Sequence, residues 1–467
     1  MNTYSDGFHE ECAVFGIYGA PEAAATTVMG LFALQHRGQE GTGIVTYDDT
    51  CGKFRPYRAL GLVGDTFGNP AVVEMLKGRS AIGHNRYSTA GKSTDPSELI
   101  KNLQPFLKEV EHGQFAIAHN GNLIKAEEKR REFINKGAIF ECSSDTELFV
   151  QYIARSKKEK FVKRFIDTLR QVEGAYSLVV LTANELIGAR DPSGFRPLVL
   201  GKLGHAFVLA SETCAFDLIG AKFLREIKPG EVVVISSEGL KSYMPLPKMP
   251  TRFCIFEYIY FARPDSQFKG KFVSDVRKQI GRELAKEHPA EADVVIAVPD
   301  SGNHTALGYS EESGIPFDFG IVRSHYVGRT FISPGGQARK ANIKLKHNPN
   351  SAVVFGKKVV LIDDSIVRAN TLLGIIEKIK EKGAKEIHVR IASPPIENPC
   401  YYGIDTPEKG DLVASHMTVE EIRKYLGATS LYYISIEGLY RATKEDRGAD
   451  NSCCDACFTG NYPIPVT

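Results

Sequence analysis

The sequence lacks the features that would place the protein in a membrane or on a nucleic acid. No run reaches the roughly eighteen apolar residues that a membrane-spanning helix needs. The first residues, MNTYSDGFHEE, are acidic and polar, unlike a signal peptide, so we expect a cytoplasmic protein. A formal net charge of +2 gives no strong field for nucleic acids or membrane surfaces. The expected partners are therefore small molecules.

The cysteines do not fit a disulfide framework, because their number, nine, is odd and no secretion signal is recognisable. Some of them are expected to do chemistry or to bind metal. The composition, 43% hydrophobic and 24% charged, is that of a globular protein. A length of 467 residues is too great for one ordinary domain, so two or more domains with sizeable cores are expected.

The stretch VVLIDDSIVRANT, residues 359–371, is the most informative part of the chain. Its four apolar residues predict a buried strand that ends in Asp363 and Asp364, before a helical pattern begins near Thr371. Adjacent carboxylates repel each other, and a sugar diol with a magnesium ion would supply the hydroxyl donors and the cation that they need. The loop at 365–371 could hold a phosphate at the helix N-terminus. The alternative is that the two acids merely cap a helix.

This stretch resembles the phosphoribosylpyrophosphate-binding loop of type I phosphoribosyltransferases. A second stretch, VPDSG at 298–302, resembles the pyrophosphate loop of that family, although alone it is as readily a plain turn. The resemblance implies that phosphoribosylpyrophosphate is bound by Ser301, Gly302, Arg323, Asp363, Asp364, Ser365, Arg368, Asn370 and Thr371. It also implies one Mg²⁺ per subunit at Ser301, Asp363 and Asp364.

The basic segment 322–350, VRSHYVGRTFISPGGQARKANIKLKHNPN, is longer than the loops of most compact domains. It could be a solvated charged face. In the family that it resembles, the equivalent segment closes over the pyrophosphate and would exclude water. Close relatives usually read KNRY and RGTT where this chain has RSHY at 323–326 and RANT at 368–371. The methyl group of Ala369 is therefore expected where the backbone approaches a phosphate.

The second half alternates expected strands and helices, which predicts an α/β fold with a parallel sheet. The expected strands are DVVIAVP, FDFGIV, KKVVLID and EIHVRIASP, and the expected helices lie near 273–288, 304–312, 371–382 and 418–426. A boundary is expected in the Pro-, Ser- and Lys-rich segment 236–250. We therefore assign residues 251–467 to a phosphoribosyltransferase domain with a cysteine-containing C-terminal extension.

The first half contains polar residues beside glycines at the ends of short apolar runs. Cys12 begins the first expected strand, and the blocks LQHRGQEGTGI (34–44), IGHNRYSTAG (82–91), AHNGNL (118–123) and SSDTEL (143–148) follow it. In this order they resemble the glutaminase domain of class II, N-terminal-nucleophile amidotransferases. The apolar runs at 176–236 predict an antiparallel sheet. The resemblance implies an αββα sandwich over residues 12–240, preceded by a propeptide at 1–11.

In that family the nucleophile is the thiol of the first mature residue, and its own α-amino group is the base. The resemblance makes Cys12 this residue once 1–11 are removed, with Asn120 and Gly121 as oxyanion donors. It also implies that Arg37, Arg86, Thr89 and Asp145 bind glutamine. Each residue has an ordinary alternative: a buried structural cysteine, a surface ion pair for Arg86, a helix cap for Asp145, and a hairpin turn for Asn120-Gly121.

Four further cysteines, Cys254, Cys400, Cys454 and Cys457, could bind a cubane iron–sulfur cluster or a tetrahedral zinc ion, and spacing alone does not choose between them. They could also be unligated. The segments around them resemble those of the Bacillus-type glutamine phosphoribosylpyrophosphate amidotransferases, which hold a [4Fe-4S] cluster. In this comparison Cys453 is a bystander, although it could exchange roles with Cys454.

The resemblance to that family, the glutamine phosphoribosylpyrophosphate amidotransferases, covers nearly the whole chain. It implies conversion of glutamine, phosphoribosylpyrophosphate and water to phosphoribosylamine, pyrophosphate and glutamate in purine biosynthesis, with ammonia passing between two sites. It also implies purine nucleotide inhibitors and a homotetramer. The alternatives are another class II amidotransferase and a regulator that senses nucleotides or phosphoribosylpyrophosphate on a degenerate transferase fold.

Overall fold

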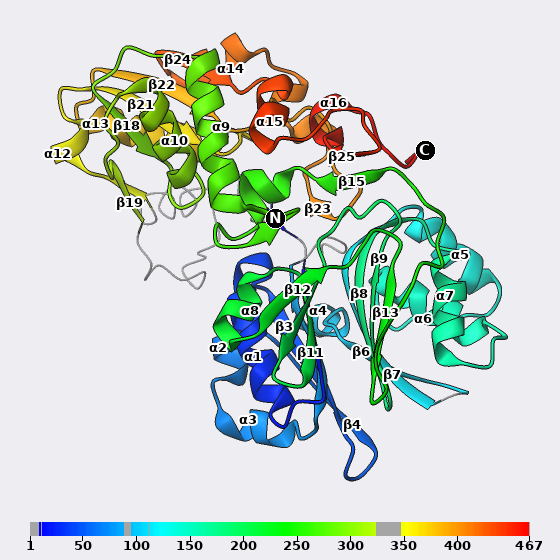
Figure 1. Ribbon diagram of the computed structural model, residues 1–467. Coiled ribbons are helices and arrows are strands. Elements are labelled where there is room, and N and C mark those ends of the chain that lie inside the picture. Colours follow the sequence, from blue (N-terminus) through cyan, green and yellow to red (C-terminus); the bar gives the residue numbers. More distant parts are fainter. Residues whose placement is uncertain (1–8, 11, 88–94, 112, 324–346, 467) are drawn as a thin grey trace.

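The computed structural model describes residues 9–10, 12–87, 95–111, 113–323 and 347–466. The first half of the chain forms the lower part of the molecule in Figure 1, and the second half lies above it. The chain passes from one to the other through the segment between β14 (Gly239–Tyr243) and β15 (Thr251–Cys254). β14 still pairs with the sheet of the first half, so that half extends past the expected end at residue 240.

The first half consists of two antiparallel sheets that face each other. The seven-stranded sheet has the order β12-β10-β11-β2-β5-β3-β4, with β2 (Ala13–Tyr18), β3 (Gly41–Asp48), β4 (Lys53–Leu60), β5 (Ser80–Arg86), β10 (Val199–Leu203), β11 (Ala206–Ala210) and β12 (Lys222–Glu226). The six-stranded sheet has the order β14-β13-β9-β8-β7-β6, with β6 (Phe106–Val110), β7 (Gly113–Leu123), β8 (Gly174–Thr182), β9 (Leu186–Arg190) and β13 (Val232–Ser236).

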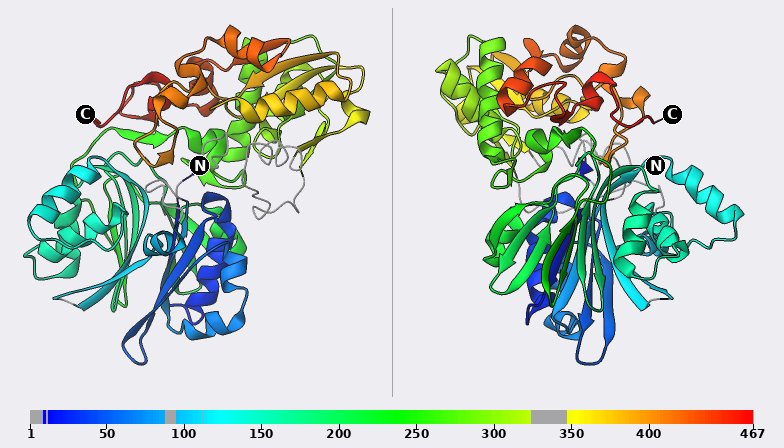
Figure 2. Two further views of the ribbon diagram at one scale, coloured as in Figure 1. Left: turned by 180° about the vertical axis from the view of Figure 1, so that it is seen from behind. Right: turned by 45° about the vertical axis from the view of Figure 1, so that its right-hand side comes forward.

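Helices cover the outer face of each sheet, as Figures 1 and 2 show. The seven-stranded sheet is covered by α1 (Ala23–Ala33), α2 (Val63–Phe67), α3 (Pro70–Met75) and α8 (Cys214–Ile219). The six-stranded sheet is covered by α5 (Ala126–Asn135), α6 (Thr146–Arg155) and α7 (Phe161–Leu169), and α4 (Pro96–Lys101) precedes β6. The expected αββα sandwich is confirmed.

Strand β2 is apolar on both faces because each face of the seven-stranded sheet packs against a core. Ala13, Phe15 and Ile17 pack under the helices, whereas Val14 points into the core between the sheets. Successive side chains of a strand point to opposite faces, so a run of apolar residues serves both cores. A methyl group on Gly16 would lie 2.6 Å from a methyl carbon of Val179, so glycine allows the sheets to approach closely here.

The second half contains a four-stranded parallel sheet in the order β18-β21-β22-β24. Its strands are β18 (Val294–Ala297), β21 (Lys358–Asp363), β22 (Glu386–Ile391) and β24 (Ser430–Tyr433). One face packs on α9 (Val273–Glu287), α10 (Asn303–Ser313) and α15 (Ile436–Thr443). The other face packs on α12 (Ser351–Val354), α13 (Asn370–Glu381) and α14 (Val419–Leu426). The expected parallel α/β fold is therefore confirmed.

One expected strand of this sheet was wrong. In FDFGIV only Phe317 forms an isolated parallel bridge, with Val295, and the end of the segment lies in β19 (Ile321–Arg323). β19 pairs antiparallel with β20 (His347–Pro349), outside the parallel sheet. The aspartate and glycine break up the apolar run, and the side chain of Phe319 is exposed. Strand β24 and helix α15, which the sequence analysis missed, complete the domain.

The remaining elements are short strands and helices. β1 (His9–Glu10) pairs antiparallel with β23 (Ile404–Asp405), and β15 pairs parallel with β25 (Asn451–Cys454). The others are η1 (Gln35–Arg37), η2 (Glu257–Phe261), β16 (Gln267–Phe268), β17 (Lys271–Phe272), η3 (Lys409–Asp411), η4 (Val413–Ser415) and α16 (Ala456–Thr459). Among the described helices, none is both long and apolar enough to cross a bilayer.

Candidate active sites

The residues predicted to form the glutaminase site, called the front site below, meet at one end of the two facing sheets. Cys12 immediately precedes β2, and its neighbour Ala13 pairs with Asn85 on β5. The opposite sheet is tied to β5 at this end, where His84 Nε2 lies 3.1 Å from the carbonyl oxygen of His119 on β7. The ends of β2, β5 and β7 therefore present their polar residues to one another.

Cys12 is half-buried and its thiol lies 3.9 Å from the carbonyl oxygen of Tyr87. Its backbone has a φ of +73°, which costs an L-residue other than glycine about 1 kcal/mol or more. This conformation at the point where residues 1–11 join the strand is unusual for a purely structural cysteine. The arrangement favours the nucleophile over the packed-thiol alternative.

The side-chain amide of Asn120 is buried, and neither of its polar atoms has a hydrogen-bond partner within the described part of the chain. Buried amides are nearly always paired, so this one is suited to receive a ligand. The neighbouring Gly121 has a φ of +144°, and a methyl group on it would lie 2.1 Å from the carbonyl oxygen of Ala175. Both residues lie inside β7 and pair with β8, so the hairpin-turn alternative was wrong.

Arg86 and Asp145 lie at the same end of the sandwich. Arg86 is buried rather than on the surface, and its Nη1 lies 3.9 Å from Oε2 of Glu40. Asp145 precedes α6 but makes no side-chain cap; its Oδ2 accepts a hydrogen bond of 2.8 Å from the backbone N–H of Leu123. The guanidinium and the carboxylate are of the kinds that bind an amino acid's carboxylate and ammonium. Thr89 lies outside the described residues.

Arg37 lies apart from this group, in a buried ion cluster between the two halves. Its Nη1 donates to Glu212 at 2.6 Å, and its Nη2 donates to both oxygens of Glu257 at 2.7 Å. Arg196 Nη1 lies 3.3 Å from Glu257 as well. All four side chains are almost completely buried. A role for Arg37 in glutamine binding stays a prediction.

Glu212, Glu257 and Arg196 were not predicted from the sequence as functional residues. Glu257 stands inside the apolar run FCIFEYIYF, and a charged residue in such a run signals a buried, paired charge. Burial alone would raise the pKa of Glu212, but the charges of His36 and Arg37 and its hydrogen bonds hold that pKa below its usual range.

The residues predicted to bind phosphoribosylpyrophosphate, called the rear site below, lie at the C-terminal end of the parallel sheet. Asp363 ends β21, and the backbone N–H of Asp364 donates to an Asp363 carboxylate oxygen at 2.9 Å. Ser301 and Ser365 each donate a short hydrogen bond to Asp364. The structure thus brings Ser301, Asp363 and Asp364 together, and their binding of magnesium stays a prediction. Burial and the neighbouring carboxylate raise the pKa of Asp363, and burial raises that of Asp364.

Gly302 approaches the backbone of the neighbouring strand, since a methyl group on it would lie 2.8 Å from the carbonyl oxygen of Ile362. The predicted basic residues are in ion pairs: Arg323 with Asp300, and Arg368 with Asp411 at 3.0 Å. Residues 324–346, most of the basic segment, lie outside the described residues.

The loop after Ser365 leads into α13, which begins at Asn370 and Thr371. Ala369 immediately precedes the helix with a φ of +64° and is buried. Its methyl group packs in the apolar cluster with Ile366 and Leu372. The methyl group thus belongs to the core, and its effect on the approach of the backbone to a phosphate stays a prediction.

The cysteine-containing segments lie together between the two halves. Cys254 on β15 is directly opposite Cys454 on β25. Burial raises the pKa of Cys457 well above its usual value, and the nearby thiols of Cys254, Cys400 and Cys454 raise it further. All four thiols are thus close enough to influence one another. In the described part of the chain, no three His, Cys, Asp or Glu side chains are arranged to hold a metal ion.

Cys453 faces away from this group. It is opposite Phe253 in the β15–β25 pair, and the groups that affect its pKa, after burial, are Lys269, Glu445, Lys271 and Asp455. Successive residues of a strand point to opposite sides, so Cys453 and Cys454 cannot both face Cys254. The register favours Cys454 as the member of the set.

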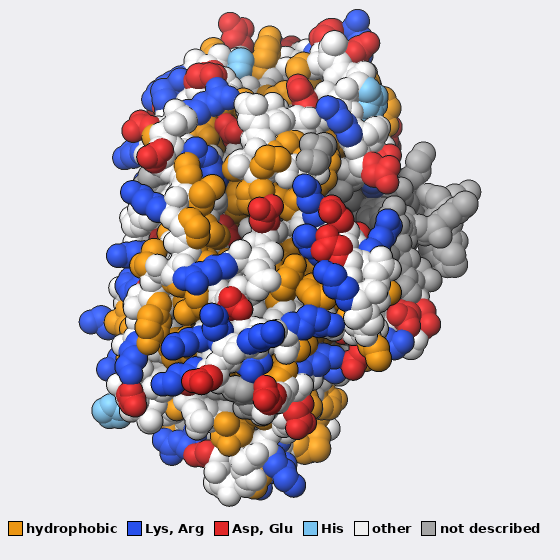
Figure 3. All heavy atoms as spheres, turned by 90° about the vertical axis from the view of Figure 1, so that its right-hand side faces the viewer, with side chains coloured by type: hydrophobic (Ala, Val, Ile, Leu, Met, Phe, Trp, Pro, Cys, Tyr) orange, Lys and Arg blue, Asp and Glu red, His pale blue; other side chains and the backbone are white. Residues whose placement is uncertain are grey.

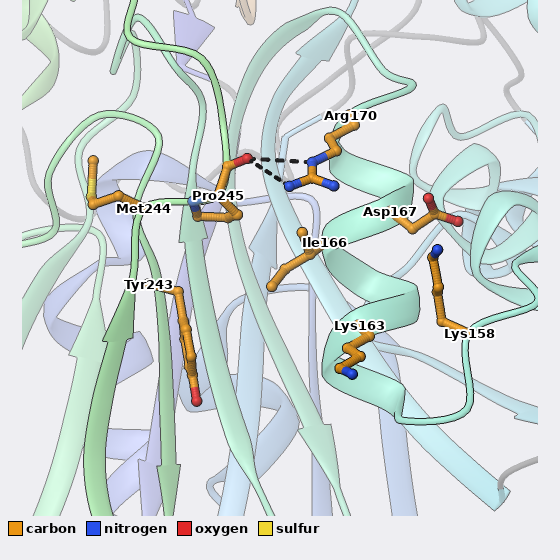
Figure 4. A pocket seen from close by; sticks show the side chains of 8 residues that line it. All are labelled: Lys158, Lys163, Ile166, Asp167, Arg170, Tyr243, Met244 and Pro245. Carbon is orange, nitrogen blue, oxygen red and sulfur yellow. Dashed lines mark hydrogen bonds between the residues drawn. The ribbon is translucent and has the colours of Figure 1, made fainter.

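A surface pocket of about 410 Å³ lies between α7 and the segment that follows β14 (Figure 4). Arg170 closes one side by donating to the carbonyl oxygen of Pro245 at 3.1 and 3.3 Å. None of the predicted site residues lines it. On the face in Figure 3, basic and acidic side chains are interspersed, which fits the absence of a single-sign field.

Two family models match the chain: a glutamine amidotransferase domain over residues 92–217 and a phosphoribosyl transferase domain over residues 271–397. An amidophosphoribosyltransferase of Rhizobium etli is 51% identical over 466 residues, covering 98% of this chain and 92% of that protein. The amidophosphoribosyltransferase of Bacillus subtilis is 45% identical over 463 residues, covering 98% and 95%.

A solved structure of glutamine phosphoribosylpyrophosphate amidotransferase from B. subtilis, complexed with ADP and GMP, matches the whole fold. It has a TM-score of 0.91 and 44% sequence identity, and 98% of each chain is covered. Sequence and structure agree over both halves, so the chain belongs to the amidophosphoribosyltransferase family.

Proposed function

We propose that this enzyme of purine biosynthesis converts glutamine, phosphoribosylpyrophosphate and water to phosphoribosylamine, pyrophosphate and glutamate. The observation that supports this most directly is the pairing of two sites in one chain. The buried amide of Asn120, which has no hydrogen-bond partner among the described residues, lies near one end of β7, and an acidic pair with a hydroxyl donor lies at the end of β21. The first suits an amide substrate and the second a sugar diol.

The front site would release ammonia through a thioester. After removal of residues 1–11, the new α-amino group of Cys12 takes the thiol proton, and the sulfur attacks the glutamine amide carbon. Asn120 and Gly121 donate hydrogen bonds to the oxyanion. The amine returns its proton to the leaving nitrogen, ammonia departs, and water hydrolyses the thioester to glutamate. Arg86, Asp145 and Thr89 would hold the substrate's carboxylate and ammonium.

The rear site would bind phosphoribosylpyrophosphate at the C-terminal end of the sheet. Asp363 and Asp364 accept hydrogen bonds from the ribose hydroxyls, and the loop of Ser365, Arg368, Asn370 and Thr371 holds the 5′-phosphate. Ser301 and Gly302, with Arg323, face the pyrophosphate. Ammonia from the front site attacks the ribose carbon C1, and pyrophosphate leaves. A Mg²⁺ ion held by Ser301, Asp363 and Asp364 would stabilise negative charge on the leaving group.

The cysteines Cys254, Cys400, Cys454 and Cys457 would hold a [4Fe-4S] cluster. The in-register pair of Cys254 and Cys454 and the mutual influence of the four thiols support this. A cluster there would connect the segment after the domain boundary with the C-terminal extension, as a structural group. We also propose a cytoplasmic homotetramer that purine nucleotides inhibit and in which ammonia passes internally between the sites. Inhibition is supported by the ADP and GMP in the B. subtilis structure.

The decisive test compares wild type with Cys12→Ala. Pyrophosphate release from phosphoribosylpyrophosphate is measured with glutamine and, separately, with ammonia. We expect the variant to lose the glutamine reaction and to keep the ammonia reaction, since only the first needs the thiol. Loss of both would contradict the division of labour. A wild-type protein that binds phosphoribosylpyrophosphate without turnover would point instead to a regulator.

A further inference from the structure

A loop of the second half, residues 400–405, lies directly on the glutaminase site of the first half. The side-chain amide of Asn122 donates to the carbonyl oxygen of Tyr401 at 3.0 Å. The ring of Tyr402 stacks on Phe195, with the ring centroids 4.3 Å apart. These contacts join residues that are more than 200 positions apart in the chain. The loop is thus fixed to the front half at several points.

Within this loop Gly403 touches Gly121, one of the two oxyanion donors proposed above. A methyl group on Gly403 would lie 2.9 Å from Gly121 Cα and 3.1 Å from its carbonyl carbon, closer than a side chain tolerates. A methyl group on Gly121 itself would lie 2.1 Å from the carbonyl oxygen of Ala175. Gly121 therefore has no room to move toward either neighbour.

Arg196 holds Gly403 in this position. Its Nε donates to the carbonyl oxygen of Tyr402 at 3.1 Å, and its Nη2 donates to that of Gly403. Its Nη1 is fixed by Glu257, whose carboxylate also binds Arg37. The contact between Gly403 and Gly121 is thus supported by a buried ion cluster rather than by a loose surface loop.

We infer that Gly403, although it belongs to the phosphoribosyltransferase half, is a positioning residue for the oxyanion hole of the glutaminase half. Its lack of a side chain lets the loop press against Gly121 and fix the peptide that must point at the oxyanion. The inference rests on the proposed role of Gly121. It predicts that the second half of the chain sets the turnover of glutamine through direct contact, independently of phosphoribosyl transfer.

The test is Gly403→Ala in the full-length, processed enzyme, with Gly239→Ala as its matched control. Both glycines have a φ of +98°, so both substitutions strain the backbone alike, but nothing lies within 4 Å of a methyl group on Gly239. We expect Gly403→Ala to lower kcat for glutamine about 10- to 100-fold, less than outright loss of a donor, with KM for glutamine within about threefold of wild type. The ammonia-dependent reaction should stay within twofold of the control.

A second readout separates positioning from general damage. Alkylation of Cys12 by a diazoketone analogue of glutamine needs a polarised carbonyl, whereas alkylation by iodoacetamide does not. Gly403→Ala should slow the first reaction and leave the second unchanged. If this variant fails to fold, as judged by circular dichroism and iron content, Asn122→Ala decides instead, with an expected selective fall in glutamine kcat of about threefold or more.

Equal activity of Gly403→Ala and Gly239→Ala with glutamine would overturn the inference, as would equal losses of the glutamine and ammonia reactions. In the fallback, unchanged glutamine turnover in Asn122→Ala would do the same. These results are distinct from failure of the proposed function, which would appear as absent glutamine-dependent turnover in the wild-type enzyme itself.

Discussion

At the scale of single residues, Ala369 shows how two opposing contributions to the free energy of unfolding, backbone strain and methyl burial, can cancel. Its left-handed backbone costs about 1–2 kcal/mol, which glycine would relieve. Glycine would lose about 0.8 kcal/mol of methyl burial and 0.5–1 kcal/mol through the freer unfolded chain. We therefore expect Ala369→Gly to change the free energy of unfolding by less than about 1 kcal/mol. Because the methyl group faces the core, KM for phosphoribosylpyrophosphate should change less than twofold.

Urea denaturation and steady-state kinetics of Ala369→Gly measure both quantities. Ala369→Val is the contrasting variant, since a β-branched residue at positive φ in a packed cluster should cost about 2 kcal/mol or more. A large improvement in substrate affinity with glycine would show that the methyl group does reach the phosphate site.

His84 provides a prediction on pH. Burial lowers its pKa from 6.5 to about 3, so the folded protein keeps it neutral while the unfolded chain binds a proton below pH 6.5. Its contribution to stability is complete above pH 6.5 and is lost as the pH falls toward 3, by about 1.4 kcal/mol per pH unit. His84→Gln should therefore lose about 1.4 kcal/mol less than wild type between pH 7.5 and 5.5. Parallel pH profiles of unfolding free energy would refute this.

At the scale of elements, the register of β15 against β25 decides which cysteine faces the proposed cluster. Cys454 is opposite Cys254, whereas Cys453 is opposite Phe253. We expect Cys454→Ser to lose iron and acid-labile sulfide and Cys453→Ser to keep both, as measured by chemical analysis and visible absorption. Zinc instead of iron in the wild type would replace the cluster proposal, and loss of iron in Cys453→Ser would contradict the register argument.

At the scale of the whole molecule, the buried cluster of Arg37, Arg196, Glu212 and Glu257 joins the two halves. Removing one carboxylate leaves buried guanidinium charge unpaired, at a typical cost of 3–5 kcal/mol. Glu257→Gln should therefore lower the free energy of unfolding by about that amount, as measured by urea denaturation. The control is Glu238→Gln, which removes an exposed ion pair with Lys241 and should change stability far less. Equal effects would mean that the cluster is not a stabilising link.

Much of the fold followed from local patterns. The apolar runs before Asp363 and after Cys12 became β21 and β2, because each strand is buried on both faces and needs an unbroken apolar run. FDFGIV misled because its apolar residues belong to an isolated bridge and an exposed edge. The proximity of Ser301 to Asp364 was foreseeable because the carboxyl ends of parallel strands meet at one edge of a sheet.

The sequence by itself determined which reactive groups the protein has. Cys12, Asn120 and the pair Asp363 and Asp364 each lie in a short segment whose residue pattern predicts its local structure. Only the tertiary structure decided which distant groups touch. The pairing of Arg37 with Glu257 and the contact of Gly403 with Gly121 depend on how the two halves dock, whereas the choice of Cys454 over Cys453 depends on the register of β15 against β25. The shapes and charges of two surfaces determine how the halves dock. Each surface is assembled from many segments of the chain, so no local sequence pattern predicts the contact between them.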